Sequence, residues 1–368
     1  MKILHAADLH LGSPMETHLS AKKAKQRRAE QKNAFADLLR TAKTERVSAV
    51  LLCGDIAETA DLHGETAAYV LEMLSDLAPI PVYMIRGNHD PLLFSGVVLP
   101  DNVTLFSDGW QSVMLNDGEV SIAISARELP LGSLTIDAFM KGYPTVKDAD
   151  IHIAMLHGQL TDALTFGGDG FLLPRKAFAG KNIDYLALGH IHARSSEHID
   201  RTCLASYSGC LMGRGFDECG EKGFIMLDIH KSAGGKAELS TEFYKTNARI
   251  YHHVCIDVTD LPLDAMALSG AVEAATADMD ERDIVRVELI GEESPEAMRD
   301  LAMIAARLEE RFYAAELRDR RGVKIDIDAL ARDVSLKGVF IKNVLSSELS
   351  EEDKAAVIRM GIGALRGS

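Results

Sequence analysis

Five short clusters of metal-ligating side chains stand between positions 8 and 192, and each directly follows a short apolar run. They are Asp8-Leu9-His10, Gly54-Asp55, Gly87-Asn88-His89-Asp90, His157-Gly158 and Gly189-His190-Ile191-His192. Residues i and i+2 of an extended segment point the same way, so Asp8 and His10 can present two ligands to one site. The same spacing relates His190 and His192. Carboxylate, imidazole and carboxamide ligands without a thiolate suit manganese, iron or zinc better than copper(I), calcium or magnesium. Of these we expect manganese.

The number of candidate ligands points to two ions rather than one. The candidates are Asp8, His10, Asp55, Asn88, His157, His190 and His192. Asp55 is the candidate for a carboxylate that both ions share. A pair of divalent ions stabilises the attacking and the leaving oxygen of a phosphoryl displacement. The pattern therefore predicts a phosphoester hydrolase.

A single histidine after a strand is usually an ordinary polar loop residue, and Gly-Asn-His is often a turn. That explanation does not cover five clusters at five predicted strand ends. The histidines outside the clusters are expected to be structural, with His18 and His63 as exceptions because they lie in loops near the site. These other histidines are His5, His18, His63, His152, His198, His230, His252 and His253.

The apolar runs that must position the clusters are typical of buried strands. They are Ile3–Ala7, Ala49–Cys53, Val82–Ile85, Ile151–Leu156 and Tyr185–Leu188. Such runs indicate strands covered on both faces, and the apolar spacing in Lys22–Glu45 and Glu65–Leu77 predicts helices between them. Strands alternating with helices indicate a layered α/β domain. Functional residues of open α/β sheets gather beyond the carboxyl ends of the strands, so the five clusters can meet in one cleft.

The later part of the chain is predicted to form separate structural units. A catalytic domain is predicted over 1–246, a small acidic α/β capping domain over 247–326 and a helical tail over 327–368. Further strands are expected at Asp117–Ser125, Gly223–Ile229, Ile250–Val258, Ile284–Ile290 and Tyr313–Arg318. Further helices are expected at Leu263–Met279, Pro295–Phe312 (with Ser294 as N-cap), Asp328–Asp333, Ser335–Ser346 and Glu351–Leu365.

Composition excludes several classes of protein. With 368 residues, 47% of them hydrophobic and 26% charged, the chain is neither disordered nor fibrous. No apolar run is long enough to span a membrane, and the amino terminus resembles a buried strand rather than a signal peptide, so we expect a cytoplasmic protein. The five cysteines show no Cys-x-x-Cys spacing and are expected to be reduced thiols.

Charge is distributed unevenly along the chain. The net charge is −15. Ala21–Arg46 nevertheless holds nine Lys or Arg against three Asp or Glu, a net of +6, whereas Asp257–Glu310 holds four against fifteen, a net of −11. The basic segment either grips phosphates beside the cleft or is a solvated helix face.

The order D-x-H, G-D, G-N-H-D, H and G-H-x-H resembles the calcineurin-like metallophosphoesterases over roughly the first 230 residues. Tyr207-Ser208-Gly209 and Lys222-Gly223-Phe224 resemble the SbcD-type DNA-repair exonuclease branch, and the small domain with its tail is similar to YhaO-like members. The resemblance implies a β-sandwich flanked by helices.

The resemblance also assigns roles to the clustered residues. One ion would be held by Asp8, His10, Asp55 and His192, and the other by Asp55, Asn88, His157 and His190. His89 would protonate the leaving oxygen or stabilise the transition state, and Asp90 would orient His89. An imidazole beside the metals that is not a ligand suits acid catalysis near neutral pH.

Two segments depart from the pattern of the nuclease branch. Ile56-Ala57-Glu58 stands where Leu-Phe-Asp is common, and Ser208-Gly209-Cys210 stands where Pro-Gly-Ser is common. We expect neither segment to contact a candidate ligand. The departures bear on DNA as the substrate, not on the metal chemistry.

Three functions are compatible with the sequence. The first is a DNA exonuclease and endonuclease in DNA repair. The resemblance implies that it works with an SbcC-like ATPase carrying a coiled coil, which would dock on apolar faces of the tail helices. A homodimer is also possible. The second, which the acidic total favours, is a phosphoesterase for a small molecule such as a cyclic nucleotide or phosphomonoester. The third is a non-catalytic assembly module, against which the complete ligand set argues.

Overall fold

The strands that end in ligand clusters belong to two sheets. The computed structural model describes every residue except 16–18, 59–63, 108, 131, 145, 147, 169, 295, 296, 298, 324–331, 333, 351, 352, 355, 359 and 362–368. The first sheet has the order β16 (Ala237–Lys245), β15 (Gly223–Lys231), β1 (Lys2–Ala6), β2 (Ala49–Cys53), β3 (Val82–Ile85), β4 (Val103–Leu105). The second has the order β13 (Ser195–His198), β14 (Leu204–Tyr207), β12 (Tyr185–Gly189), β8 (Ile151–His157), β6 (Ser121–Ala126), β5 (Gln111–Asn116).

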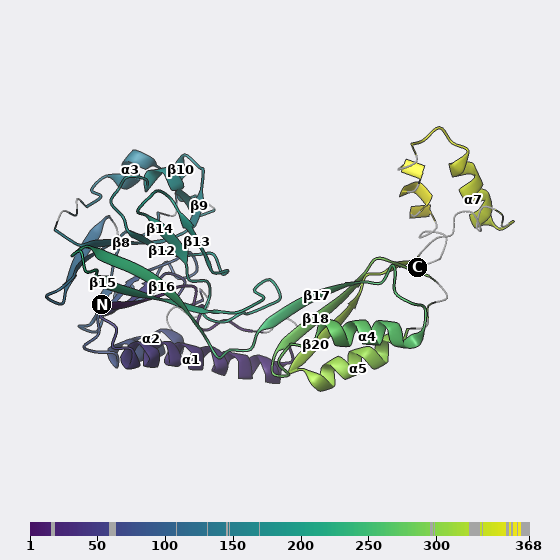
Figure 1. Cartoon of the computed structure of the whole chain (residues 1–368), viewed down its shortest axis with the longest axis horizontal. Helices are drawn as coiled ribbons and strands as arrows, with labels where there is room; N and C mark the ends of the chain where they lie inside the picture. The colour runs from purple at the N-terminus through teal and green to yellow at the C-terminus, as the bar shows by residue number, and fades with distance from the viewer. Residues whose placement is uncertain are drawn as a thin grey trace. The chain divides into compact units, whose positions relative to one another are not determined.

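The two sheets face each other across an apolar core. Leu51 and Ile85 of the first sheet are fully buried in one cluster with Ile153 and Ala187 of the second. The helices α1 (Ala21–Thr44) and α2 (Glu65–Ser75) cover the other face of the first sheet, and α3 (Ile136–Met140) lies over the second sheet (Figure 1). This arrangement confirms the predicted α/β class, a β-sandwich flanked by helices.

The strand directions bring the clusters to the same edge of each sheet. The strands β1, β2 and β3 run parallel, and so do β8 and β12. Their carboxyl ends therefore meet at one edge of their own sheet. Short strand pairs lie outside the sandwich: β7 (Leu134–Thr135) with β10 (Thr165–Phe166), β9 (Gln159–Thr161) with β11 (Leu172–Pro174), and β19 (Glu292–Glu293) with β21 (Gly322–Val323).

Two predictions about element bounds are wrong. The segment predicted as one strand at Asp117–Ser125 is instead the turn of a hairpin followed by β6. The Asn116 Oδ1 accepts the Gly118 N–H at 2.7 Å, and Gly118 adopts φ +92°, which ends β5 at that point. Helix α5 (Leu301–Arg311) begins after Asp300, whose carboxylate accepts the Met303 N–H, so Ser294 is not its N-cap.

The chain divides into two compact units, Met1–His252 and His253–Ser368. The second unit has the three-stranded sheet β17 (Tyr251–Asp257), β18 (Ile284–Ile290) and β20 (Ala314–Asp319). The helices α4 (Ala265–Ala275) and α5 pack on it through an apolar cluster that includes Leu268, Val287 and Leu308. Helix α7 (Leu336–Leu345) confirms the predicted helix at Ser335–Ser346, whereas the helix predicted at Asp328–Asp333 lies almost entirely outside the described residues. No helix in the described part of the chain is long and apolar enough to cross a membrane.

Candidate metal centre

The backbone at the strand ends is held in unusual conformations. Asp8, His10, Asp55 and His190 all have positive φ, between 46° and 98°. Non-glycine residues in this region cost on the order of 1–3 kcal/mol each and persist only where the surroundings fix them. Glycine is required beside them, because a Cβ at Gly87 would lie 2.2 Å from Asp55 Oδ1. The strand ends are therefore shaped to aim side chains at one place.

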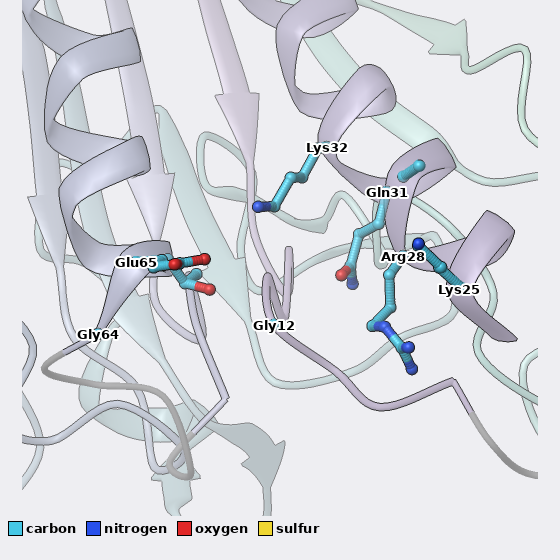
Figure 2. A pocket seen from close by; sticks show the side chains of 9 residues that line it. Gly12, Lys25, Arg28, Gln31, Lys32, Gly64 and Glu65 are labelled. Atoms are coloured by element: carbon cyan, nitrogen blue, oxygen red, sulfur yellow. The ribbon is translucent and has the colours of Figure 1, made fainter. Parts of the chain in front are cut away.

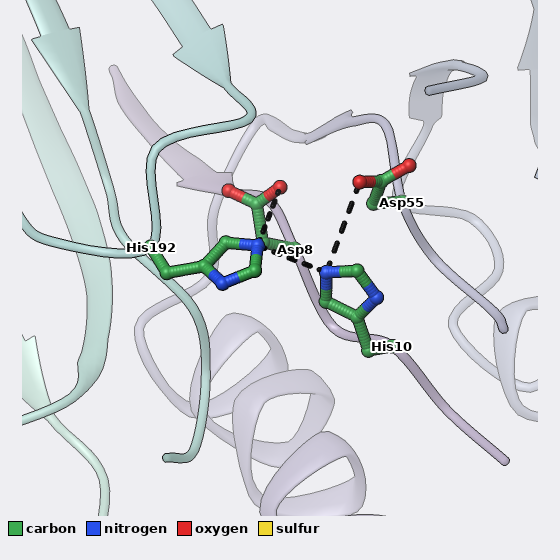
Figure 3. Close-up of side chains that lie close together, drawn as sticks. All are labelled: Asp8, His10, Asp55 and His192. Carbon is green, nitrogen blue, oxygen red and sulfur yellow. Dashed lines mark hydrogen bonds and ion pairs between the residues drawn. The ribbon is translucent and has the colours of Figure 1, made fainter. Parts of the chain in front are cut away.

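Four of the predicted ligands form a first donor set. The Asp8, His10, Asp55 and His192 side chains each offer a ligand atom within 4.8 Å of the others (Figure 3). The His10 and His192 Nε2 atoms lie 3.1 Å apart. Asp55 Oδ2 is 3.7 Å from His10 Nε2, and Asp8 Oδ1 is 4.0 Å from His192 Nε2. The set brings two carboxylates and two imidazoles to one point.

The other predicted ligands form a second donor set around Asn88. The Asn88 Oδ1 lies 3.0 Å from His157 Nε2 and 3.0 Å from His190 Nδ1. Asp55 Oδ2 is 3.4 Å from His157 Nε2. Asp55 therefore touches both donor sets, which is the position that a shared carboxylate needs.

Burial and mutual charge shift the acidity of these groups. Burial raises the pKa of Asp8, with the Asp55 charge acting in the same direction. Burial lowers the pKa of His157, but the charge and hydrogen bond of Asp55, together with Asp8 and the Cys53 carbonyl, raise it to about 9. Burial and the neighbouring His157 lower the pKa of His190 to about 4. Two buried carboxylates amid facing imidazole nitrogens make a donor set that fits divalent cations.

The structure places Glu58 beside the His89 ring and Asp90 in the loop that carries His89. The Asp90 carboxylate accepts the backbone N–H groups of Gly87 at 2.6 Å and Ile56 at 2.7 Å, and burial raises its pKa to about 6. The His89 Nδ1 instead lies 3.2 Å from Glu58 Oε2. Asp90 thus holds the loop that carries His89, while Glu58 contacts the ring; that Asp90 orients His89 stays a prediction.

The prediction that Ile56-Ala57-Glu58 and Ser208-Gly209-Cys210 do not contact a candidate ligand is wrong. Glu58 Oε1 lies 2.8 Å from His10 Nδ1. The Cys210 N–H donates to the backbone oxygen of His192 at 3.2 Å. Both segments therefore contact residues of the first donor set.

Two further residues of the site were missed by the sequence analysis. Glu218 Oε1 lies 2.7 Å from His192 Nδ1, and the Arg214 guanidinium contacts both Glu58 and Glu218. The Arg214–Glu218 spacing of four residues was the available signal, but it occurs commonly on protein surfaces. His5 and His152 are buried and hydrogen-bonded, which fits a structural role, whereas His18 and His63 lie outside the described residues.

A basic groove lies beside the first cluster. Its volume is about 540 Å³, and its lining includes Gly12, Lys25, Arg28 and Lys32 together with Glu65 at the start of α2 (Figure 2). The buried Gln31 amide of α1 donates to the backbone oxygens of Leu9 and His10 at 3.1 and 2.8 Å. The helix that carries the groove's cations is thus fastened directly to the loop of the first donor set.

Facing sheets with two donor sets at the strand ends define a metallophosphoesterase. The chain belongs to the calcineurin-like phosphoesterase family, whose model matches residues 1–194. Members of this family bind a dimetal centre.

Individual proteins are similar to this chain at low identity. The uncharacterized metallophosphoesterase YhaO of Bacillus subtilis is 28% identical over 272 residues, covering 71% of this chain and 64% of that protein. The SbcD component of the nuclease SbcCD of Bacillus subtilis is 27% identical over 262 residues, covering 60% of this chain and 64% of that protein. The chain therefore spans 64% of the length of each relative.

Proposed function

We propose that the chain is a dimetal phosphodiesterase that cleaves DNA. The observation that carries the proposal is the convergence of two donor sets that share Asp55. Manganese is the expected metal, with iron or zinc as alternatives. Asp8, His10, Asp55 and His192 would hold one ion, and Asp55, Asn88, His157 and His190 the other. The ions would supply charge stabilisation for a phosphoryl group.

His89 is the proposed proton donor to the leaving oxygen. Its ring is 41% exposed, compared with 26% for the side chain of the proposed ligand His192, so a substrate can reach it. The hydrogen bond to Glu58 is the main cause that raises the pKa of His89, which keeps the ring protonated to higher pH. The His89 N–H also donates to Asp55 Oδ1 at 2.8 Å, which fixes the residue beside both donor sets. A positioned, protonated imidazole is the group that general acid catalysis needs.

The groove supports a polynucleotide substrate. Lys25, Arg28 and Lys32 stand at spacings of three and four, so they lie along one face of α1 and line the same groove (Figure 2). A row of cations, on the helix whose Gln31 contacts the backbone of His10, suits successive phosphates of a strand better than a single small ester. The relative named as part of a nuclease supports the same substrate.

An SbcC-like ATPase is the proposed partner, docked on the tail. Ile341 and Val344 of α7 are buried, as is Ile358, so part of the predicted apolar surface packs internally. Leu336 and Met360 remain 70% and 77% exposed. Exposed apolar side chains on terminal helices suit the helix-in-groove mode of docking.

The test is an assay of labelled duplex and single-stranded DNA with Mn²⁺, run beside a small nitrophenyl phosphodiester. The triple variant Lys25→Gln, Arg28→Gln, Lys32→Gln is compared with the charge-matched variant Arg40→Gln, Lys43→Gln, Arg46→Gln, whose residues lie at and just beyond the carboxyl-terminal end of α1. The groove variant should lose DNA affinity and flatten its salt dependence, by a log–log slope of about 0.7–0.9 per lost phosphate contact, while it cleaves the small ester normally. Hydrolysis of the small ester without cleavage of either DNA would favour the alternative, a small-molecule phosphoesterase.

A further inference from the structure

The Arg214 guanidinium joins two carboxylates that come from distant parts of the chain. Its Nη1 lies 2.5 Å from Glu58 Oε1, and its Nη2 lies 2.7 Å from Glu218 Oε1. The Arg214 backbone N–H also donates to Glu218 Oε2 at 2.7 Å. Glu58 follows β2 of the first sheet, whereas Arg214 and Glu218 lie between β14 and β15. Arg214 thus connects the loop after β2 of the first sheet to the segment that follows β14 of the second sheet.

Each of these carboxylates lies beside the Nδ1 atom of at least one histidine in the site. Glu58 Oε1 lies 2.8 Å from His10 Nδ1, and its Oε2 lies 3.2 Å from His89 Nδ1. Glu218 Oε1 lies 2.7 Å from His192 Nδ1. A carboxylate that hydrogen-bonds Nδ1, as Glu218 does at His192, favours the tautomer with its proton there, which leaves Nε2 as the ligand atom and fixes the rotation of the ring.

The ring orientations agree with that assignment. His10 and His192 turn their Nε2 atoms toward each other at 3.1 Å, at the centre of the first donor set. The Glu218 side chain is 4% exposed and that of Arg214 is 20% exposed, so water competes little with these contacts. A planar guanidinium presents several N–H groups in a fixed fork, which suits it to hold two carboxylates at a set separation.

We propose that Arg214 is a positioning residue that, through Glu58 and Glu218, fixes His10, His89 and His192 relative to one another. The inference rests on the proposed metal centre but not on the substrate. Its expected consequence is on metal binding, because the ligands His10 and His192 belong to the first donor set. Loss of such outer contacts typically weakens metal affinity by about 10–100-fold.

The experiment is titration of Mn²⁺ into the metal-free full chain by calorimetry, with electron paramagnetic resonance to detect magnetic coupling between two bound ions. Arg214→Gln and Arg214→Lys are compared with Arg175→Gln. Arg175 is a matched control because it also bridges two carboxylates, Asp162 and Glu197, in the same unit. Folding of each variant is checked by circular dichroism.

The proposal expects Arg214→Gln to bind one of the two ions about 10–100-fold more weakly and to lose the coupled signal. Arg214→Lys should be intermediate, since an ammonium restores the charge but not the fork, and Arg175→Gln should match wild type. Wild-type affinity and coupling in a folded Arg214→Gln, accompanied by a raised KM for DNA, would make Arg214 a substrate contact and overturn the proposal. If Arg214→Gln does not fold, unchanged affinity in Arg214→Lys overturns it. A wild-type chain that binds two ions but cleaves no DNA would refute the proposed function alone.

Discussion

Asp55 is the residue whose loss should affect both proposed ions at once. Its Oδ2 lies 3.7 Å from His10 Nε2 in one donor set and 3.4 Å from His157 Nε2 in the other. Asp55→Asn keeps the size of the side chain and an oxygen that can accept the His89 N–H. The substitution therefore removes the charge while leaving the shape of the loop nearly unchanged.

The magnitude follows from the distances. At an effective dielectric constant of about 20, a single positive charge about 3.5 Å from the carboxylate interacts with it by about 5 kcal/mol, and a divalent ion interacts more strongly. Because about 1.4 kcal/mol corresponds to a tenfold change in affinity, each ion should bind at least on the order of 10³-fold more weakly. Burial opposes ionisation of Asp55, but His157 and hydrogen bonding hold its pKa well below the usual range, so the wild-type group is charged at neutral pH.

The assay is calorimetric titration of Mn²⁺ into metal-free Asp55→Asn, with the metal content and the phosphodiesterase turnover of the purified protein. Asp117→Asn, in the exposed turn between β5 and β6, is the matched control and should behave as wild type. Asp55→Asn should contain little metal and show almost no turnover, while its circular dichroism stays native. Two tightly bound ions together with wild-type turnover would refute the shared-carboxylate assignment.

Three further predictions concern catalysis, stability and docking. His89→Ala should retain metal but lose about 10²–10⁴-fold in turnover. The loss should be smaller on a nitrophenyl ester, because its leaving group needs no proton. Equal losses on both substrates would show that His89 is not the acid. Burial lowers the pKa of His5 to about 4, so the neutral ring stabilises the fold above pH 6.5 and this contribution, about 3 kcal/mol, is lost as the pH falls to about 4. Urea unfolding of His5→Gln should show a decline that is smaller by about that amount, because His190, whose pKa is also lowered, still contributes, whereas the surface control His230→Gln should show the full decline. Deletion of Ser335–Ser368 should leave a folded, active nuclease that no longer co-purifies with the ATPase; an aggregating product would indicate that the tail belongs to the core.

The strand ends of the site were predictable because their signal is local. Ala49–Cys53 and Val82–Ile85 are short apolar runs followed within two residues by glycine, and they match the strands β2 and β3 residue for residue. The turn at Asn116-Asp117-Gly118 carried a local signal too, since Asn and Asp followed by Gly favour hairpin turns. The prediction placed a strand across it because Val120 and the apolar residues after it dominated the pattern.

Contacts between distant segments were not predictable in the same way. Glu58 and Arg214 are separated by 156 positions, and their pairing depends on how the two sheets pack. Ser294 and Asp300 are both acceptable N-caps by residue type. Asp300 occupies that position in the structure, and only the packing of Ile304 and Leu308 fixes where α5 begins. Residue type and spacing thus predicted which candidate ligands converge, but not the groups that contact them.

The distribution of the ligands over both sheets has a consequence for how the site is kept in shape. The loops that carry Asp8, Asp55 and Asn88 follow strands of the first sheet, whereas His157 and His192 follow strands of the second. Neither sheet holds a complete donor set, so the separation of the ligands depends on the apolar core between the sheets. Close-packed cores are stiff, and they can therefore support the strained backbone at the strand ends. Beyond the edge of that core, Arg214 contacts Glu58 and Glu218 and so joins the loop after β2 to the segment between β14 and β15.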